Sequence, residues 1–195
     1  HGHVVPGKVE RRKELANSAM MHPCVYVAQT STAFPMHFYQ AIREANAFPG
    51  PALVNVYTTC QPEHGVADDL SQTQSKRAVT SRAFPLYIHD PRKGKTLRER
   101  LSLRGNPNNT DDWAKDPKTK EPYRFIEFAR TEGRFAKHFD AQGNPSEAIL
   151  AAQEDRLDNW RLLQELAGQG RTPAKAVSQP TSNPDGKAPA AASGA

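Results

Sequence analysis

The side chain with the clearest potential for chemistry is Cys60, which follows a short apolar run within residues 48–65. The run over residues 52–58 is rich in β-branched and aromatic types, which is typical of a strand covered on both faces of a parallel sheet. Pro62 and Gly65 are expected to end it. Ligands and cofactors of open α/β sheets collect beyond the carboxyl ends of the strands. The position favours a role for Cys60, although a free cysteine taken alone is usually an inert thiol.

Several polar side chains follow Cys60 within ten residues, namely Glu63, His64, Asp68 and Asp69. Asp68 and Asp69 are expected to cap the next helix, because a carboxylate accepts hydrogen bonds from free helical amides. No second acid is evident that would pair with Glu63 for acid–base chemistry. A lone loop histidine such as His64 is expected to shape the loop. The sequence therefore predicts no catalytic residue in this segment.

Cys24 is the only other cysteine, and it follows Pro23 at the start of the first expected strand. It is expected to be a packed thiol. Two cysteines imply no disulfide framework and fit a reducing cytosol. The sequence shows no signal peptide or membrane span, so the expected location is cytoplasmic. It begins at His1 without Met, and it reads as a piece of a longer protein.

The elements that would position Cys60 follow an α/β order. The expected elements are a short helix at 13–21, a strand at Val25–Thr30, a helix at 35–47, a strand at 52–58, a helix from about 68 to 82 and a strand at Leu86–His89. Residues 25–58 thus form a strand–helix–strand crossover, which by default is right-handed and makes its strands parallel. The buried side of the 35–47 helix is expected to be apolar.

The remaining segments divide the chain by composition. Residues 1–20 are expected to be an incoming loop and short helix, 21–91 the α/β segment, 92–122 a polar irregular arm, 123–168 C-terminal helices and 169–195 a disordered tail. An aromatic stripe from Phe125 to Phe139 has helical spacing and is expected to be core rather than a cofactor site. A second helix is expected at about 145–167.

The net charge of +5 is concentrated locally, because residues 76–104 hold nine Lys or Arg against Asp90 and Glu99. A basic surface of this kind can attract nucleic acid, a membrane or an acidic protein, and it can equally be an ordinary solvated surface. A basic nucleic-acid-binding module therefore stays open as an alternative function. The sequence offers no groove-reading helix or set of stacking aromatic side chains, so we expect neither nucleic acid nor membrane as a partner.

Residues 50–66, Gly-Pro-Ala-Leu-Val-Asn-Val-Tyr-Thr-Thr-Cys-Gln-Pro-Glu-His-Gly-Val, resemble the late part of the thiamine-diphosphate domain of single-chain pyruvate:ferredoxin (flavodoxin) oxidoreductases. Flanking segments resemble the same family, at Arg12–Leu15 and Val25–Ala28 upstream and at Lys76–Val79 and Phe84–Arg92 downstream. The resemblance covers residues 8–92 well and 123–167 loosely. It departs from the family around residues 102–107 and at an insertion over 113–122.

The resemblance implies a partial thiamine-diphosphate-binding fold with parallel strands and crossover helices. It also implies that Cys60 is the last ligand of a [4Fe–4S] cluster whose other three ligands lie earlier in the parent chain. Such clusters take four thiolates, so this chain cannot hold one alone. The family binds thiamine diphosphate through Mg²⁺ at a Gly-Asp-Gly segment. That segment is absent here and is expected upstream of His1, so no thiamine-diphosphate ligand is identified in this chain.

The implied function is oxidative decarboxylation of a 2-oxoacid, of the pyruvate type, to acyl-CoA, with electrons leaving through iron–sulfur clusters. The implied partners are the remainder of the parent polypeptide, a second copy in a homodimer, coenzyme A, the 2-oxoacid and ferredoxin or flavodoxin. The basic residues 76–104 could favour an acidic electron carrier. A second alternative is a non-catalytic adaptor subunit that keeps the fold without the chemistry.

Overall fold

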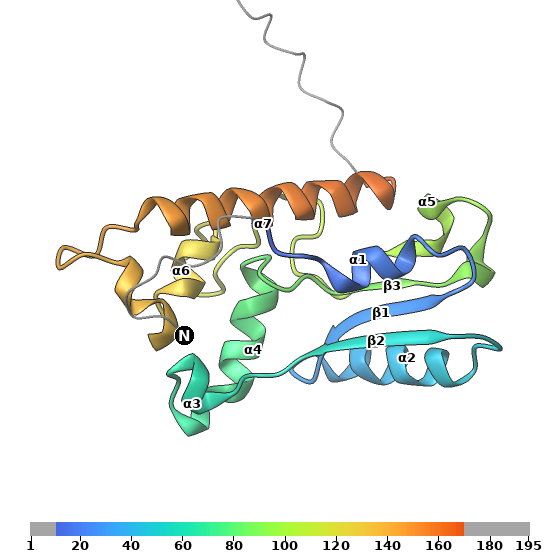
Figure 1. The fold of residues 1–195 in the computed structure, drawn as a ribbon, viewed down its shortest axis with the longest axis horizontal. Coiled ribbons are helices and arrows are strands. Elements are labelled where there is room, and N and C mark those ends of the chain that lie inside the picture. Colours follow the sequence, from blue (N-terminus) through green and yellow to red (C-terminus); the bar gives the residue numbers. More distant parts are fainter. Residues whose placement is uncertain (1–10, 170–195) are drawn as a thin grey trace, which may run out of the picture.

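The computed structural model describes residues 11–169, so the expectations for residues 1–10 and for the tail from 170 onward lie outside the described part. In chain order the elements are α1 (Leu15–Met20), β1 (Tyr26–Ser31), α2 (Pro35–Asn46), β2 (Ala52–Tyr57), α3 (Gln61–His64), the 3₁₀ helix η1 (Asp68–Leu70), α4 (Ser71–Thr80), β3 (Tyr87–His89), the 3₁₀ helix η2 (Pro91–Lys93), α5 (Leu97–Arg100), β4 (Leu101–Ser102), α6 (Phe125–Ala129), the 3₁₀ helix η3 (Gly133–His138) and α7 (Glu147–Leu166) (Figure 1).

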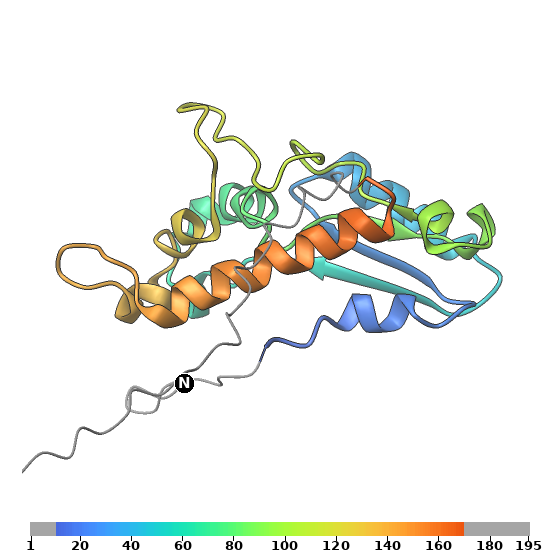
Figure 2. The ribbon, with the colours of Figure 1, turned by 90° about the horizontal axis from the view of Figure 1, so that it is seen from above.

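The strand–helix–strand unit predicted for residues 25–58 is confirmed. β1 and β2 are parallel, with Tyr26 opposite Ala52 and Ser31 opposite Tyr57, and α2 connects them. Side chains alternate across β1, as the pleat of a strand requires. Val27 belongs to a core with α1 and α7, whereas Tyr26 and Ala28 pack toward α2 on the other face. The sheet therefore lies between α2 on one side and α1 with α7 on the other (Figure 2).

The expectation of a parallel third strand is wrong, because β3 runs antiparallel to β1 and β4 antiparallel to β3. The sheet is mixed, with strand order β2-β1-β3-β4. A parallel third strand would need a crossover helix that returns along the sheet to its starting edge. α4 instead stands beyond the carboxyl ends of β1 and β2, so β3 begins at that edge and runs back (Figure 1).

The expectation that residues 52–58 are covered on both faces is also wrong. All six residues of β1 are buried, whereas Ala52 and Val56 of β2 are exposed and the other four residues of β2 are half-buried. The reason is topological, since β2 is the outermost strand and pairs only with β1 among the described residues. The apolar composition of β2 thus exceeds what this part of the chain buries.

The long helix α7 joins two cores. Trp160 and Leu163 pack against the sheet with Tyr87, while Ile149 packs with the aromatic residues of α6 and η3. The predicted aromatic stripe is therefore core, as expected. Figure 1 shows α7 running along much of the length of the molecule, above part of the sheet at one end and above α6 at the other.

The expected irregular arm at residues 92–122 holds more regular structure than its composition suggests, including α5 and β4. Arg82 fixes the rest of the arm, because its buried guanidinium donates hydrogen bonds to the carbonyls of Asn108 at 2.7 Å and Asp112 at 3.3 Å. The same guanidinium stacks 4.0 Å above the ring of Trp160. Burial lowers the pKa of Arg82 to about 10.

Candidate functional site at the carboxyl end of β2

Cys60 lies three residues beyond the end of β2, where the chain turns into α3. Its thiol is exposed. Its carbonyl accepts a hydrogen bond from the amide of His64 at 2.9 Å, which closes the single turn of α3. Gly65 ends that turn in the left-handed region with a φ of 62°, a conformation that favours glycine. The thiol is therefore presented to solvent at the edge where α/β proteins place their ligands.

Thr59 anchors the residue before the cysteine. It is buried, and its hydroxyl lies 3.2 Å from the hydroxyl of Ser75 and 3.4 Å from the carbonyl oxygen of Ser71, both on α4. Because Thr59 is buried and the next residue, Cys60, is exposed, the backbone here directs the Cys60 side chain outward. The anchor to α4 therefore holds the exposed thiol on a defined backbone.

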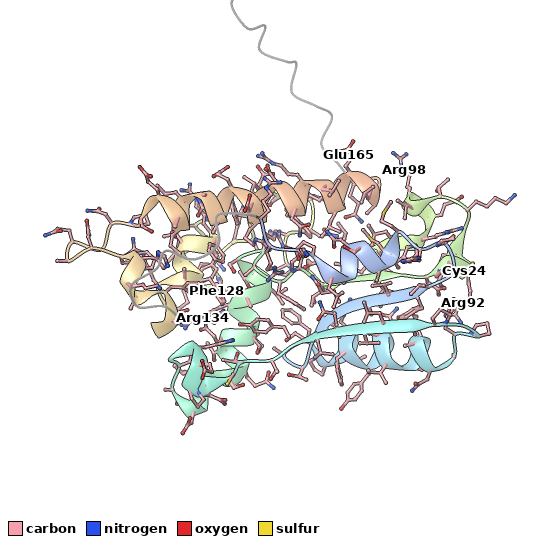
Figure 3. The ribbon with its side chains drawn as sticks, viewed as in Figure 1. Cys24, Arg92, Arg98, Phe128, Arg134 and Glu165 are labelled. Atoms are coloured by element: carbon pink, nitrogen blue, oxygen red, sulfur yellow. The ribbon has the colours of Figure 1, made fainter. Side chains whose placement is uncertain are left out.

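A buried carboxylate lies behind the loop that carries Cys60. Glu132 is 1% exposed, and its Oε1 accepts hydrogen bonds from Gln74 Nε2 at 3.1 Å and from the hydroxyl of Tyr57 at 3.3 Å. Its Oε2 accepts from Arg134 Nε at 2.5 Å. Figure 3 shows Arg134 at the end of the molecule where α3 and the 125–139 segment meet. A buried charge is tolerated when it is paired and hydrogen-bonded in this way.

His64 faces the same carboxylate. Its Nδ1 lies 3.5 Å from Glu132 Oε1, without the alignment of a hydrogen bond. Burial, with the positive charge of Arg134 as the next cause, lowers the pKa of His64 despite the nearby acids. Burial and the charge of Glu132 raise the pKa of Tyr57 to about 12. Both rings are therefore neutral near pH 7, and the loop-shaping role expected of His64 stays a prediction.

The carboxylates nearest to Cys60 in sequence form no acid–base pair. Glu63, Asp68 and Asp69 are all exposed. The capping expectation for Asp68 and Asp69 is wrong, since both lie inside η1, whose N-cap is Ala67, and α4 begins after Leu70 with no side-chain cap. The extra 3₁₀ turn shifts the helix start past both aspartates.

Cys24 lies at the opposite end of the sheet from Cys60. It precedes β1, whereas Cys60 follows β2, and the two strands are parallel over six residues. A six-residue strand is roughly 20 Å long, too far for two ligands of one cluster. The expectation of a packed thiol is wrong, because Cys24 is exposed in the turn between α1 and β1. Figure 3 places Cys24 beside Arg92, away from α3.

Within residues 11–169, no three His, Cys, Asp or Glu side chains come together in a way that could hold a metal ion. The donor set at the carboxyl end of β2 fits one corner of a [4Fe–4S] cluster, because it offers one exposed thiol, while such a cluster takes four thiolates. The described helices also include none long and apolar enough to cross a membrane.

The basic residues 76–104 do not form one face. Arg82 is buried against Trp160, and Arg92 forms a two-point ion pair with the carboxylate of Asp90. Arg100 donates to the carbonyl of Gly94 at 2.8 Å. The more exposed cations of η2 and α5 lie at the end of the sheet remote from α3 (Figure 3). The cations of η2 and α5 are therefore separated from Cys60, whereas Lys76 and Arg77 lie on α4, the helix that anchors Thr59 beside Cys60.

Sequence reasoning missed Glu132 and its partners Gln74 and Arg134. The only local signal is that Thr131-Glu132-Gly133-Arg134 interrupts the aromatic stripe with charged residues and a glycine. Such an interruption marks the end of α6 but says nothing of the residue that Glu132 meets. Its contacts with Tyr57 and Gln74 span 75 and 58 residues of sequence.

With this geometry in view, sequence comparison defines the class of protein. The chain is homologous to 2-oxoacid oxidoreductases that act with ferredoxin or flavodoxin. In particular, it is 34% identical over 169 residues to the pyruvate-flavodoxin oxidoreductase of Rhodospirillum rubrum and 40% identical over 171 residues to that of Klebsiella pneumoniae. Each match covers 84% of this chain and 13% of the relative.

A second group of relatives consists of subunits rather than long single chains. The ketoisovalerate oxidoreductase subunit VorB of Pyrococcus horikoshii is 28% identical over 156 residues, which cover 80% of this chain and 43% of that subunit. The chain therefore spans about an eighth of the long relatives and less than half of this subunit. No protein-family model matches the chain.

Proposed function

We propose that the chain is the carboxyl-terminal part of the thiamine-diphosphate domain of a 2-oxoacid:ferredoxin or flavodoxin oxidoreductase, with pyruvate as the 2-oxoacid and a cytoplasmic location. The observation that carries the proposal is the exposed thiol of Cys60 beyond β2, in a chain homologous to enzymes of this class. In the complete enzyme, thiamine diphosphate supplies the decarboxylation chemistry and the clusters carry the electrons.

The role proposed for this chain is to hold one corner of a [4Fe–4S] cluster through Cys60. The buried Thr59 fixes the backbone before the thiol, and the hydrogen-bonded Glu132 supports the loop behind it. A ligand held on a rigid loop keeps its geometry while the cluster changes charge, and burial and hydrogen bonding around it tune the potential. The remaining three thiolates come from the parent polypeptide.

The separation between the basic cations of η2 and α5 and the Cys60 loop bears on the electron carrier. An acidic carrier that docked on those cations would stand at the far end of the sheet from the proposed cluster ligand. We therefore propose ferredoxin or flavodoxin as the partner of the whole enzyme without assigning its docking site to residues 76–104.

Iron and acid-labile sulfide in the whole parent protein test the proposal. Substitution Cys60→Ser is expected to remove the iron and sulfide of one cluster. Cys24→Ser, the matched change at the other exposed cysteine, is expected to leave the iron and sulfide content unchanged. In the loaded protein Cys60 is expected to resist alkylation while Cys24 reacts, and release of the cluster is expected to make both reactive.

Equal iron content in the parent protein and its Cys60→Ser variant would contradict the proposed ligand. A parent that holds no iron, and whose upstream sequence lacks both a Gly-Asp-Gly segment and three further cysteines, would instead support the non-catalytic adaptor.

A further inference from the structure

The outer edge of β2 has no strand partner among residues 11–169. Its sequence, Ala-Leu-Val-Asn-Val-Tyr, contains no charge and no proline. Exposed edge strands of soluble proteins normally carry lysine, proline or a bulge, because unpaired backbone groups recruit other strands. β2 has none of these features, so its sequence is that of a strand that is paired on both sides.

The apolar surface continues from the edge of β2 onto α2. Val56 is 37% exposed, and its register opposite Thr30 places its side chain on the same face of the sheet as α2. Met36 and Tyr39 on α2 are 81% and 68% exposed. Figure 1 shows α2 and β2 side by side along one border of the molecule. Methionine and tyrosine are enriched where proteins bury surface against a partner.

We propose that this surface, the outer edge of β2 with Val56, Met36 and Tyr39, docks the polypeptide that precedes the segment in the parent oxidoreductase, and that a strand of it pairs with β2. The inference rests on the proposed function. The region shared with this chain is 13% of each of two long relatives, and the proposed function places the polypeptide that covers the edge upstream of that region.

The position of Cys60 supports the same occupant. The cysteine follows β2 by three residues, and its three companion thiolates must come from polypeptide outside this chain. A strand added parallel to β2 ends beside Cys60, which brings upstream polypeptide to the point where the other ligands are required. A second copy of this chain would cover the edge equally well but would bring only two cysteines, Cys24 and Cys60, which is fewer than the three further ligands required.

Hydrogen exchange on the whole parent protein tests the pairing. Successive amides of a strand point to opposite sides, so alternate amides of β2 face β1 and the others face outward. If upstream polypeptide adds a strand, both sets exchange within about tenfold of one another and at least roughly a hundredfold more slowly than amides without hydrogen-bond partners. Outward amides that exchange as fast as unpaired ones would overturn the proposal.

A photo-activatable phenylalanine analogue in place of Tyr39 identifies the occupant by the peptide it cross-links. The same analogue in place of Leu162, a 47% exposed apolar residue on α7, is the matched control. Cross-links from position 39 to upstream sequence, absent from position 162, support the proposal. Cross-links from position 39 to residues 36–57 of a second copy, or none at all, would overturn it.

Protection of the outward amides tests the docking surface, whereas the iron content tests the proposed function, so the two can fail independently. A parent protein that keeps its iron but leaves the outward amides unprotected refutes the docking surface alone. A parent that protects those amides but holds no iron refutes the cluster role of Cys60 and leaves the docking surface standing.

Discussion

Gly65 and Gly133 lie in direct backbone contact, where the loop carrying Cys60 meets the start of η3. The amide of Gly133 donates to the carbonyl of Gly65 at 3.2 Å, and a Cβ built on Gly65 would lie 2.8 Å from the Cα of Gly133. No side chain fits between two backbones at this distance. The contact makes the conformation of the Cys60 loop depend on the C-terminal part of the chain.

Substitution Gly65→Ala is therefore expected to cost more than its φ angle alone explains. A left-handed alanine costs about 1–2 kcal/mol, and the clash with Gly133 adds to that cost because a backbone cannot move aside cheaply. Gly143→Ala is the matched control, since Gly143 also has a positive φ of 82° but would meet only the flexible guanidinium of Arg130. Urea unfolding measures both, and equal losses would contradict the role of the contact.

Loss of the buried carboxylate is expected to destabilise the loop behind Cys60. Glu132→Ala removes the acceptor of the Tyr57 hydroxyl, one of the two acceptors of Gln74 Nε2 and the ion-pair partner of Arg134, and should cost about 3 kcal/mol. Glu132→Gln keeps an acceptor oxygen but loses the charge that faces Arg134, and should cost about 1–2 kcal/mol. The exposed Glu154, changed to Gln, is the control and should alter the free energy of unfolding by less than about 0.5 kcal/mol.

Faster hydrogen exchange of residues 61–66 in the Glu132 variants, with unchanged exchange in β1, would locate the effect in the Cys60 loop. Uniform acceleration across the chain would show instead that Glu132 only contributes to global stability.

Arg82→Lys is expected to loosen residues 105–122, the part of the 92–122 arm that follows β4. An ammonium cannot stack on Trp160 and also reach the carbonyls of both Asn108 and Asp112, so the change should cost about 2 kcal/mol. Limited proteolysis should then cut the arm faster. Arg43→Lys on the exposed side of α2 is the control. An arm that resists proteolysis equally in both variants would refute the role of Arg82.

His37 makes stability dependent on pH. Burial lowers its native pKa to about 4, although its Nδ1 lies 2.9 Å from the hydroxyl of Thr30 and Glu44 acts to raise the pKa. Between pH 6.5 and 4 the unfolded chain binds a proton that the native state does not. The free energy of unfolding therefore falls as the pH falls through this window, by about 3 kcal/mol at most from this residue.

Urea unfolding at several pH values measures that contribution. His37→Gln should flatten the dependence between pH 6.5 and 4, and His22→Gln, the same change at an exposed histidine, is the control. The pKa values of His64 and His89 are also lowered by burial, and their contributions remain in both variants. An unchanged slope in His37→Gln would contradict the assignment.

The crossover from β1 through α2 to β2 could be predicted because its signals are local. Residues 25–58 contain two apolar runs bounded by turn residues and, between them, a segment with helical periodicity. The antiparallel direction of β3 could not be predicted in this way, because it depends on α4 standing at the end of the sheet instead of across its face. That placement is a tertiary choice, and the sequence of α4 does not encode it locally.

The candidate site shows the same division. Cys60 could be placed at the end of a strand from its neighbours in sequence, and its exposure agrees with that position. The exposure of β2 could not, because an apolar strand has the same sequence whether its partner is present or absent. The burial of Glu132 could not be predicted from its neighbours in sequence, because its hydrogen-bond partners Tyr57 and Gln74 lie far away along the chain.

The two cores share the twenty-residue helix α7, which contributes Ile149 to one and Trp160 with Leu163 to the other. A helix of this length is about 30 Å long and rigid. Unfolding of the whole helix would expose apolar surface in both halves at once. The sheet and the helical segment behind Cys60 are therefore bound into a single cooperative unit, and a disturbance in one half is felt in the other.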